Sequence, residues 1–179
     1  MNQDLGAAKA MPNKSLVAEC FELSLVLEHS MRAYYRTMAK RFSNSLPIHD
    51  FLSLMAVDET KHIALLEKMR LAAHPTSWTH EALSAVLEDL FKLSHLIDQA
   101  VACEGDNFLE VFEQIGRIES SKINDAFIML TLGLPPGPGI HVDPKALIQD
   151  HLKKIGGLGL KMTAKEMRNL KPIFMGAGV

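Results

Sequence analysis

The amino-acid sequence predicts an all-helical protein, an antiparallel four-helix bundle with a helical C-terminal extension. Apolar residues recur every three or four positions over four long segments, and prolines and glycines separate these segments by short connections. No window shows the sustained alternation of apolar and polar residues that is typical of a strand. Because short connections between long helices make neighbours antiparallel, we expect one bundle domain over residues 14–133.

The first two predicted helices are separated by a proline. The first covers about residues 15–42, and Pro47 marks its end. The second covers about residues 51–73 and stops at Pro75. Proline lacks the backbone N–H that a helix interior needs, so both positions indicate helix boundaries.

The third and fourth predicted helices have polar or glycine boundaries. The third follows the polar stretch Thr76–Thr79 and ends near Gly105. The fourth begins at Asn107, whose side chain suits an N-cap, with the carboxylate of Glu110 three residues further on. We expect this helix to continue to Gly133.

Shorter segments precede and follow the bundle in the sequence. Residues 1–13 are expected to be a flexible N-terminus, and the Pro/Gly-rich residues 134–143 a linker. Beyond the linker, the tail over residues 144–179 is expected to form helices at about 144–155 and 164–170. We expect this tail to pack on its own bundle or to mediate a homodimer.

Composition narrows the class of protein. Of the 179 residues, 47% are hydrophobic, which is enough for a core. The net charge of −2 and the pI of about 6.4 give no electrostatic reason for a nucleic-acid or anionic-membrane partner. The apolar stretch around 126–134 is too short to cross a bilayer. Cys20 and Cys103 lie in apolar-periodic stretches and are interpreted as reduced, buried thiols. We expect a soluble, cytoplasmic protein.

Three predicted helices carry carboxylates in the middle of an otherwise apolar stripe. These are Glu28 on the first helix, Glu59 on the second and Glu119 on the fourth. Burying an unpaired carboxylate costs several kcal/mol, so each needs a partner, a metal ion or a proton. Because Glu59 and His62 are three residues apart, an oxygen and a ring nitrogen can reach one ion from one helix face.

Metal-free interpretations stand beside this one. Glu28, Glu59 and His62 would also satisfy one another as a hydrogen-bonded core cluster, and Glu119 would pair with Lys122 on a partly solvated face. Tyr35 is interpreted as core packing. The remaining histidines have no carboxylate at ligand spacing on an apolar stripe and are assigned surface or capping roles: His29, His49, His74, His80, His95, His141 and His151.

This pattern resembles the rubrerythrin-type ferritin-like proteins over about residues 14–133. The likeness is carried by Glu28–Tyr35, by Leu52-x-x-Met55-x-x-x-Glu59-x-x-His62 and by Phe112-x-x-Ile115-x-x-x-Glu119-x-x-Lys122. In that family, glutamates on the first and third helices join Glu-x-x-His on the second and fourth to hold two irons. The resemblance implies that the metal ligands are Glu28, Glu59, His62 and Glu119, with Tyr35 and Lys122 beside them.

The sequence departs from the family's ligand pattern in two places. Lys122 stands where the second histidine would be, and a protonated ammonium has no lone pair for a metal. The third-helix ligand is open between Glu88, on a polar stripe, and Asp89, on a more apolar one.

The second connection also raises a question of topology. A ferritin-like bundle needs a crossover as long as the bundle between the second and third helices, whereas His74–Thr79 reaches only about 20 Å when extended. Either the crossover is short and staggered, or helical turns fray into it, or the bundle runs plainly up and down.

We therefore expect a metal-binding ferritin-like protein with one ion per chain, iron first, although the same donors accept manganese and zinc. The resemblance implies chemistry with O2 or peroxide, or oxidation of ferrous iron, and Lys122 argues against full di-iron activity. The alternative is a non-catalytic helical scaffold or interaction protein that kept the fold, lost the site and holds no metal.

Overall fold

The computed structural model describes residues 13–73, 78–102, 107–121, 123–132 and 143–159. All regular secondary structure within the described residues is helical, without a strand. None of their helices is long and apolar enough to cross a membrane. The helices, in order, are α1 (Asn13–Arg41), α2 (Leu46–Ala72), α3 (His80–Ala102), α4 (Phe108–Glu119), α5 (Ile123–Leu132) and α6 (Pro144–Gly159).

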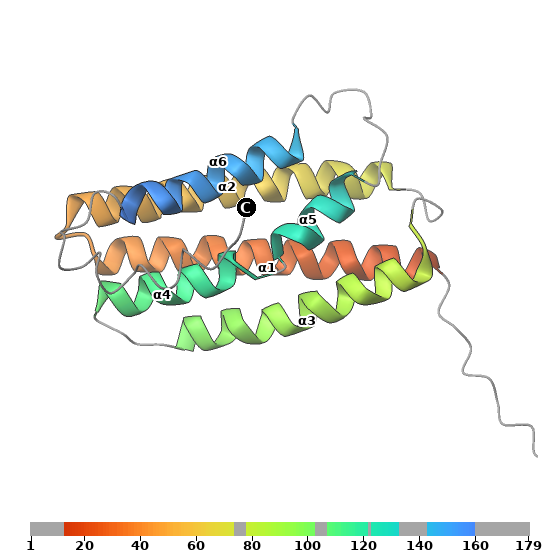
Figure 1. The fold of residues 1–179 in the computed structure, drawn as a ribbon, viewed down its shortest axis with the longest axis horizontal. Coiled ribbons are helices and arrows are strands. Elements are labelled where there is room, and N and C mark those ends of the chain that lie inside the picture. Colours follow the sequence, from red (N-terminus) through yellow and green to blue (C-terminus); the bar gives the residue numbers. More distant parts are fainter. Residues whose placement is uncertain (1–12, 74–77, 103–106, 122, 133–142, 160–179) are drawn as a thin grey trace, which may run out of the picture.

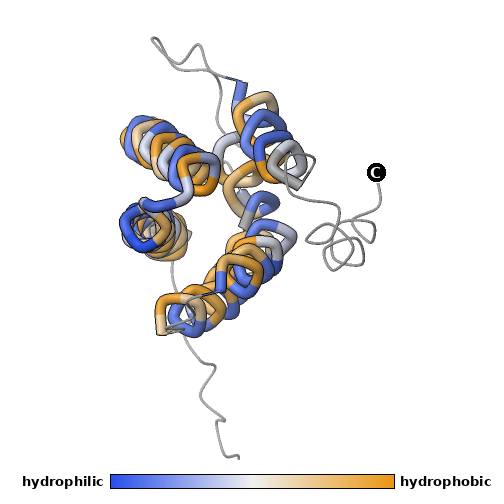
Figure 2. The backbone as a smooth tube through the Cα atoms, turned by 90° about the vertical axis from the view of Figure 1, so that its left-hand side faces the viewer, coloured by the Kyte–Doolittle hydropathy of each residue, from blue (hydrophilic) through white to orange (hydrophobic). Residues whose placement is uncertain are grey.

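Successive long helices run in alternating directions (Figure 1). Helix α1 packs along α2 on one side and along α3 on the other, and α4 followed by α5 returns along α3. Helix α6 lies on α2 and α5. Seen nearly along their axes, the helices surround a common interior (Figure 2).

The connection between α2 and α3 settles the question of topology raised by the sequence. Residues 73–79 reach about 25 Å at most, whereas α2, with 27 residues, is about 40 Å long. Helix α3 therefore begins at the end where α2 stops, and the order is plainly up and down. A crossover along the length of the bundle is not present at this connection.

Helix α2 begins earlier than the sequence prediction of residue 51. It begins at Leu46, so Pro47 lies in its first turn instead of separating two helices by a loop. Proline suits this turn because the first N–H groups of a helix have no intrahelical partner and because its φ angle is already helical.

The prediction of one continuous fourth helix to Gly133 is wrong, because the helix stops at Glu119 and restarts at Ile123. Side chains compete for the carbonyls at the break: Ser121 Oγ donates to Ile118 O, and Asn124 Nδ2 donates to Glu119 O at 2.8 Å. Helix α5 then departs at an angle towards α6 (Figure 1). The break leaves Glu119 at the C-terminal end of α4.

One core connects all six helices. Its large, fully buried members include Phe21 of α1, Leu52 of α2 and Phe112 of α4. Trp78, just before α3, packs edge-on against Phe21 with a centroid distance of 6.2 Å and donates Nε1–H to Met129 O at 3.2 Å.

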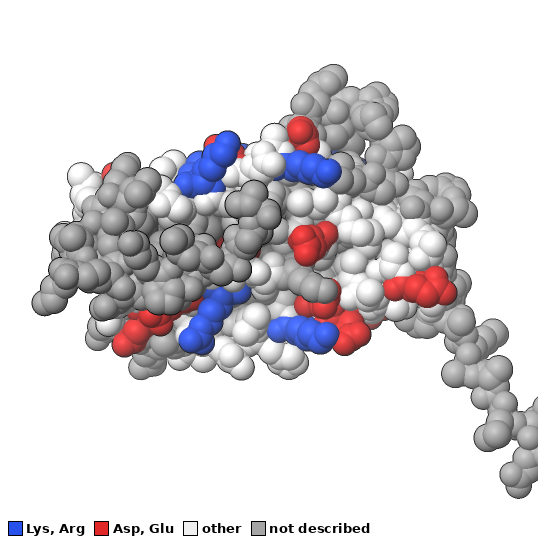
Figure 3. Space-filling view, in the orientation of Figure 1, with Lys and Arg blue, Asp and Glu red and all other residues white. Residues whose placement is uncertain are grey.

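Cys20 lies in this core and is a free thiol, as the sequence predicted, and burial raises its pKa to about 11. On the face drawn in Figure 3, acidic and basic side chains are interspersed among uncharged ones. Cys103 and the predicted helix at 164–170 lie outside the described residues.

Candidate metal centre

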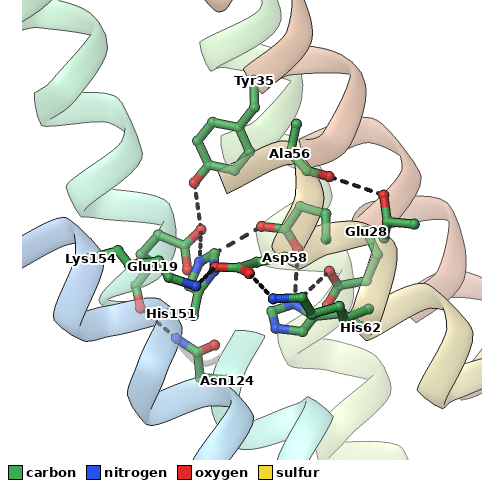
Figure 4. Close-up of polar contacts among 12 residues, drawn as sticks. Glu28, Tyr35, Ala56, Asp58, His62, Glu119, Asn124, His151 and Lys154 are labelled. Carbon is green, nitrogen blue, oxygen red and sulfur yellow. Dashed lines mark hydrogen bonds and ion pairs between the residues drawn. The ribbon is translucent and has the colours of Figure 1, made fainter. Parts of the chain in front are cut away.

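Carboxylates and an imidazole meet in the middle of the α1–α2 interface. His62 Nδ1 lies 2.9 Å from Glu59 Oε2 and 3.2 Å from Glu28 Oε2 (Figure 4). All three side chains are buried. The sequence placed Glu28, Glu59 and His62 together, and the structure brings them into one group in which three donor atoms lie within 4.8 Å of one another.

A second group shares Glu59 and draws on two other helices. Glu119 comes from the last turn of α4, and His151 comes from the middle of α6. His151 Nε2 lies 3.1 Å from Glu119 Oε1 and 3.7 Å from Glu59 Oε1. Both residues are buried, and the donor atoms of this group also lie within 4.8 Å of one another.

The two oxygens of Glu59 therefore face different groups. Oε2 contacts His62 in the first group, and Oε1 faces His151 in the second. An ion about 2.1 Å from its ligands separates two of them by about 3–3.5 Å, so small side-chain movements would bring either group to coordination distance. A carboxylate placed in this way is able to bridge two ions.

Burial and neighbouring charges shift the acids in opposite directions. Burial and the negative charge of Glu28 raise the pKa of Glu59 well above its ordinary value. Burial alone would also raise the pKa of Glu28, but the hydrogen bond from Glu59 and the charge of His62 outweigh it and hold that pKa below the usual range. The opposite directions are those expected of two adjacent buried carboxylates, because one of them binds a proton more readily when the other keeps its charge.

The histidines respond to the same field. Burial tends to lower the pKa of His62, yet the neighbouring Glu28 raises it above its ordinary value. For His151 the charge of Glu119 and the contact with Asp58 outweigh burial and raise the pKa to about 10. Protons thus balance the cluster as cations would, and deprotonation would release the same donors for a metal ion.

Several polar atoms of the site are buried without a hydrogen-bond partner among the described residues. They are His62 Nε2, both ring nitrogens of His151, and Ser24 Oγ, one turn from Glu28 on α1. His151 Nε2 is close to Glu119 but lies off the direction of a hydrogen bond. An unsatisfied buried polar group costs about 1–3 kcal/mol, and a water molecule or a metal ion bound here would satisfy these atoms.

Neighbouring residues hold the ligands in place. Tyr35 O–H donates to Glu119 Oε1 at 2.7 Å, and Asn124 binds the Glu119 carbonyl (Figure 4). The ring of Phe127 packs 5.0 Å from that of His62. The sequence interpreted Tyr35 as core packing, and it is indeed fully buried, but its hydroxyl also contacts a candidate ligand.

The third helix contributes no donor to either group. Glu88 is exposed and pairs with Lys92 at 2.7 Å, and Asp89 is half-buried, 3.8 Å from the same ammonium. The face of α3 that enters the core is apolar, with Leu83, Leu90 and Ile97. The side chain of Lys122 lies outside the described residues, so its expected place beside the site stays a prediction.

The surface or capping role expected for His151 is wrong. Its neighbours on one face of α6 are Pro144, Ile148 and Ile155, at steps of three and four residues, and all are buried. This periodicity was available in the sequence. Spacing along the chain does not mark His151 as a ligand, because its carboxylate partners lie on α2 and α4 instead of one turn away on α6.

The other histidines within the described residues keep their expected positions. His29 and His95 are exposed, and His49 and His80 are half-buried, whereas His74 and His141 lie outside the described residues.

Comparisons of the chain with protein-family models, with curated proteins and with solved structures each found no match. The interpretation of the site therefore rests on its residues.

Proposed function

We propose that this protein is a helical metal-binding protein whose buried centre holds two transition-metal ions bridged by Glu59. The observation that carries the proposal is that the two Glu59 oxygens face different Glu–His pairs, Glu28 with His62 and Glu119 with His151. Each position would then have two carboxylates and one imidazole. Positions left open on each ion would take water or a small oxidant.

The proposal changes the expected stoichiometry from one ion to two. The sequence argued for one because Lys122 replaces the second histidine of the family pattern. His151 supplies an imidazole for that position from a different helix, with its Nε2 turned towards Glu59 and Glu119. The relationship to rubrerythrin-type proteins remains part of the proposal and rests on the ligand pattern, since the α2–α3 connection lacks the long crossover.

The donor set supports iron, manganese or zinc, since carboxylate and imidazole bind all three. We propose iron, with O2 or peroxide as the small-molecule oxidant, because two adjacent redox ions are able to exchange two electrons. The chain's own residues would bind the ions and exclude bulk water, and the Tyr35 hydroxyl would donate a hydrogen bond to Glu119.

Metal content is the direct test. Protein purified without chelator and then loaded with ferrous iron under nitrogen should contain about two iron ions per chain, as measured by inductively coupled plasma mass spectrometry. Glu59→Gln should reduce binding at both positions, and His62→Gln mainly at one. His95→Gln is the matched control, because His95 is an exposed histidine on α3, and it should behave as wild type. Less than about a tenth of an equivalent of iron, manganese or zinc after loading would refute the proposal.

The structure also offers an observation in favour of the scaffold alternative. The cluster is able to balance its charge with protons alone, since Glu59 and both histidines have raised pKa values. Replacing Glu59 and His62 together by alanine distinguishes the two functions. A metal centre should lose extra stability only when metal is present, whereas a scaffold should show the same change in unfolding free energy with and without metal.

A further inference from the structure

Asp58 is a buried carboxylate that lies next to Glu59 on α2 and contacts α6. Its Oδ1 pairs with Lys61 Nζ of the same helix at 2.7 Å. Its Oδ2 pairs with Lys154 Nζ at 2.6 Å and lies 3.6 Å from His151 Nδ1 (Figure 4). Two side chains of α6 therefore converge on one oxygen. Burial raises the pKa of Asp58, but these neighbours outweigh it and hold it well below its usual range.

The two nitrogens of His151 have different surroundings. Nδ1 faces Asp58, while Nε2 faces Glu119 and Glu59. A carboxylate beside one nitrogen of a neutral imidazole keeps the proton there, which leaves the lone pair of the other nitrogen for a metal ion. Asp58 lies on the side of the ring away from Glu119 and Glu59, so a proton held on Nδ1 would leave Nε2 free for an ion.

The same carboxylate holds α6 in place. Lys154 also pairs with Asp150, one turn earlier on α6, at 2.8 Å. Asp150 lies on α6 itself, whereas Asp58 lies on α2, so the Asp58 pair is the one that ties α6 to α2. Because His151 lies one turn from Lys154, the docking of α6 decides whether the histidine reaches Glu119.

The two candidate positions differ in their dependence on α6. Glu28, Glu59 and His62 come from α1 and α2 alone, which pack together along their lengths. The second position needs Glu119 from α4 and His151 from α6. The first position is therefore complete without α6, and the second is complete only when α6 is docked.

We propose that Asp58 is a positioning residue for His151, and that it couples the docking of α6 to the filling of the second metal position. This inference rests on the proposed function. The first ion binds to the α1–α2 pair, and the second binds where α6 closes over it. Binding of the second ion then stabilises docked α6, because the ion joins its histidine to ligands on α2 and α4.

The full-length chain with Asp58→Asn tests the coupling, with Asp150→Asn as the matched control that also removes a carboxylate from Lys154. Cobalt(II) is the probe: visible absorption and equilibrium dialysis follow each ion, and amide hydrogen exchange follows α6. Wild type and Asp150→Asn should bind two ions, and the second should slow exchange in α6. Asp58→Asn should keep the first ion at wild-type affinity and bind the second about tenfold or more weakly, with exchange in α6 no longer slowed.

Other outcomes separate the two claims. If wild type binds two ions and Asp58→Asn binds both with unchanged affinity, the role of Asp58 is overturned and the metal centre stands. If wild type binds no cobalt, the proposed function and this coupling both fail. Should Asp58→Asn not fold, as judged by the fluorescence of Trp78, Lys154→Gln interrupts the same link from α6. Unchanged second-ion affinity in Lys154→Gln would then overturn the coupling.

Discussion

Glu59 has two roles in the site because a carboxylate has two oxygens in one plane. One oxygen belongs to the α1–α2 group, and the other belongs to the group that α4 and α6 complete. Tyr35 acts at the far side of that second group, where its hydroxyl donates to Glu119. Burial and the charge of Glu119 raise the pKa of Tyr35 well above its ordinary value, so the phenol remains a hydrogen-bond donor.

Tyr35→Phe should destabilise the metal-free protein by about 1–3 kcal/mol, because it leaves a buried carboxylate with one donor fewer. Urea unfolding, followed by the fluorescence of the single tryptophan, Trp78, measures the change. Repeating the substitution in a Glu119→Ala background, which has no side-chain acceptor, isolates the contact as a double-mutant cycle. Equal effects of Tyr35→Phe in both backgrounds would show that the hydroxyl does not stabilise Glu119.

At the scale of elements, α6 is what makes the second group possible. It presents a short buried stripe to α2 and α5, with His151 between Ile148 and Ile155. The break between α4 and α5 serves the same arrangement, because it ends α4 at Glu119 and lets α5 turn towards α6. Helices α4 and α6, with one donor residue each, thus complete a candidate site that begins on the long α1–α2 pair.

Apolar packing of α6 is tested by Ile155→Ala, with Leu152→Ala as the control on the same helix. Ile155 is 2% exposed and Leu152 is 41% exposed. The first change should lower the unfolding free energy by about 2–5 kcal/mol through lost burial and a cavity. The second should stay within about 0.5 kcal/mol. Equal effects of the two substitutions on urea unfolding would mean that α6 does not pack as the structure has it.

For the whole molecule, the buried cluster makes stability depend on pH. In the metal-free protein His151 has a pKa of about 10, against an ordinary value of 6.5. A group with a raised folded pKa stabilises the fold fully below its unfolded pKa and loses that contribution as pH rises through the folded value. Glu59 acts in the same direction, because its pKa is also raised.

The unfolding free energy of chelator-treated protein should therefore fall as pH rises from about 7 to 10. Denaturation in urea at several pH values measures the slope. His151→Gln should flatten it, because the titrating ring is removed, while the exposed-histidine variant His95→Gln should keep the wild-type slope. A slope as steep in His151→Gln as in wild type would show that His151 does not hold its proton in the fold, whereas a shallower residual slope is the share of Glu59.

The homodimer expected from the sequence stays a prediction at this scale. The tail segment proposed to mediate it includes residues 160–179, which lie outside the described residues. The part of the tail within the described residues, α6, packs on its own chain, on α2 and α5.

Helical periodicity predicted most of what the structure shows within single helices. It placed α1 and α3 nearly at their bounds, and it identified Glu28, Glu59, His62 and Glu119 as carboxylates and an imidazole on buried faces. It overestimated the length of α4. The helical periodicity continues through Ser120 and Ser121, but the side chains of these serines compete for the helix carbonyls. Whether a helix breaks at such a point depends on local side-chain contacts, and the periodicity of apolar residues does not reveal these contacts.

By itself, then, the sequence determined the all-helical class, the Glu59–His62 pair and the buried face that carries Glu28, because spacing along one helix fixes which residues share a face. Only the tertiary structure decided that His151 joins Glu119, that the third helix contributes no donor to either group, and that Asp58 meets α6. Those contacts join helices far apart in the chain, and their spacing in the sequence carries no information about distance across a core. The direction of α3 required both the sequence and the structure. The sequence shows that the connection before α3 is short, and the length of α2 then shows that this connection is too short to run back along the bundle.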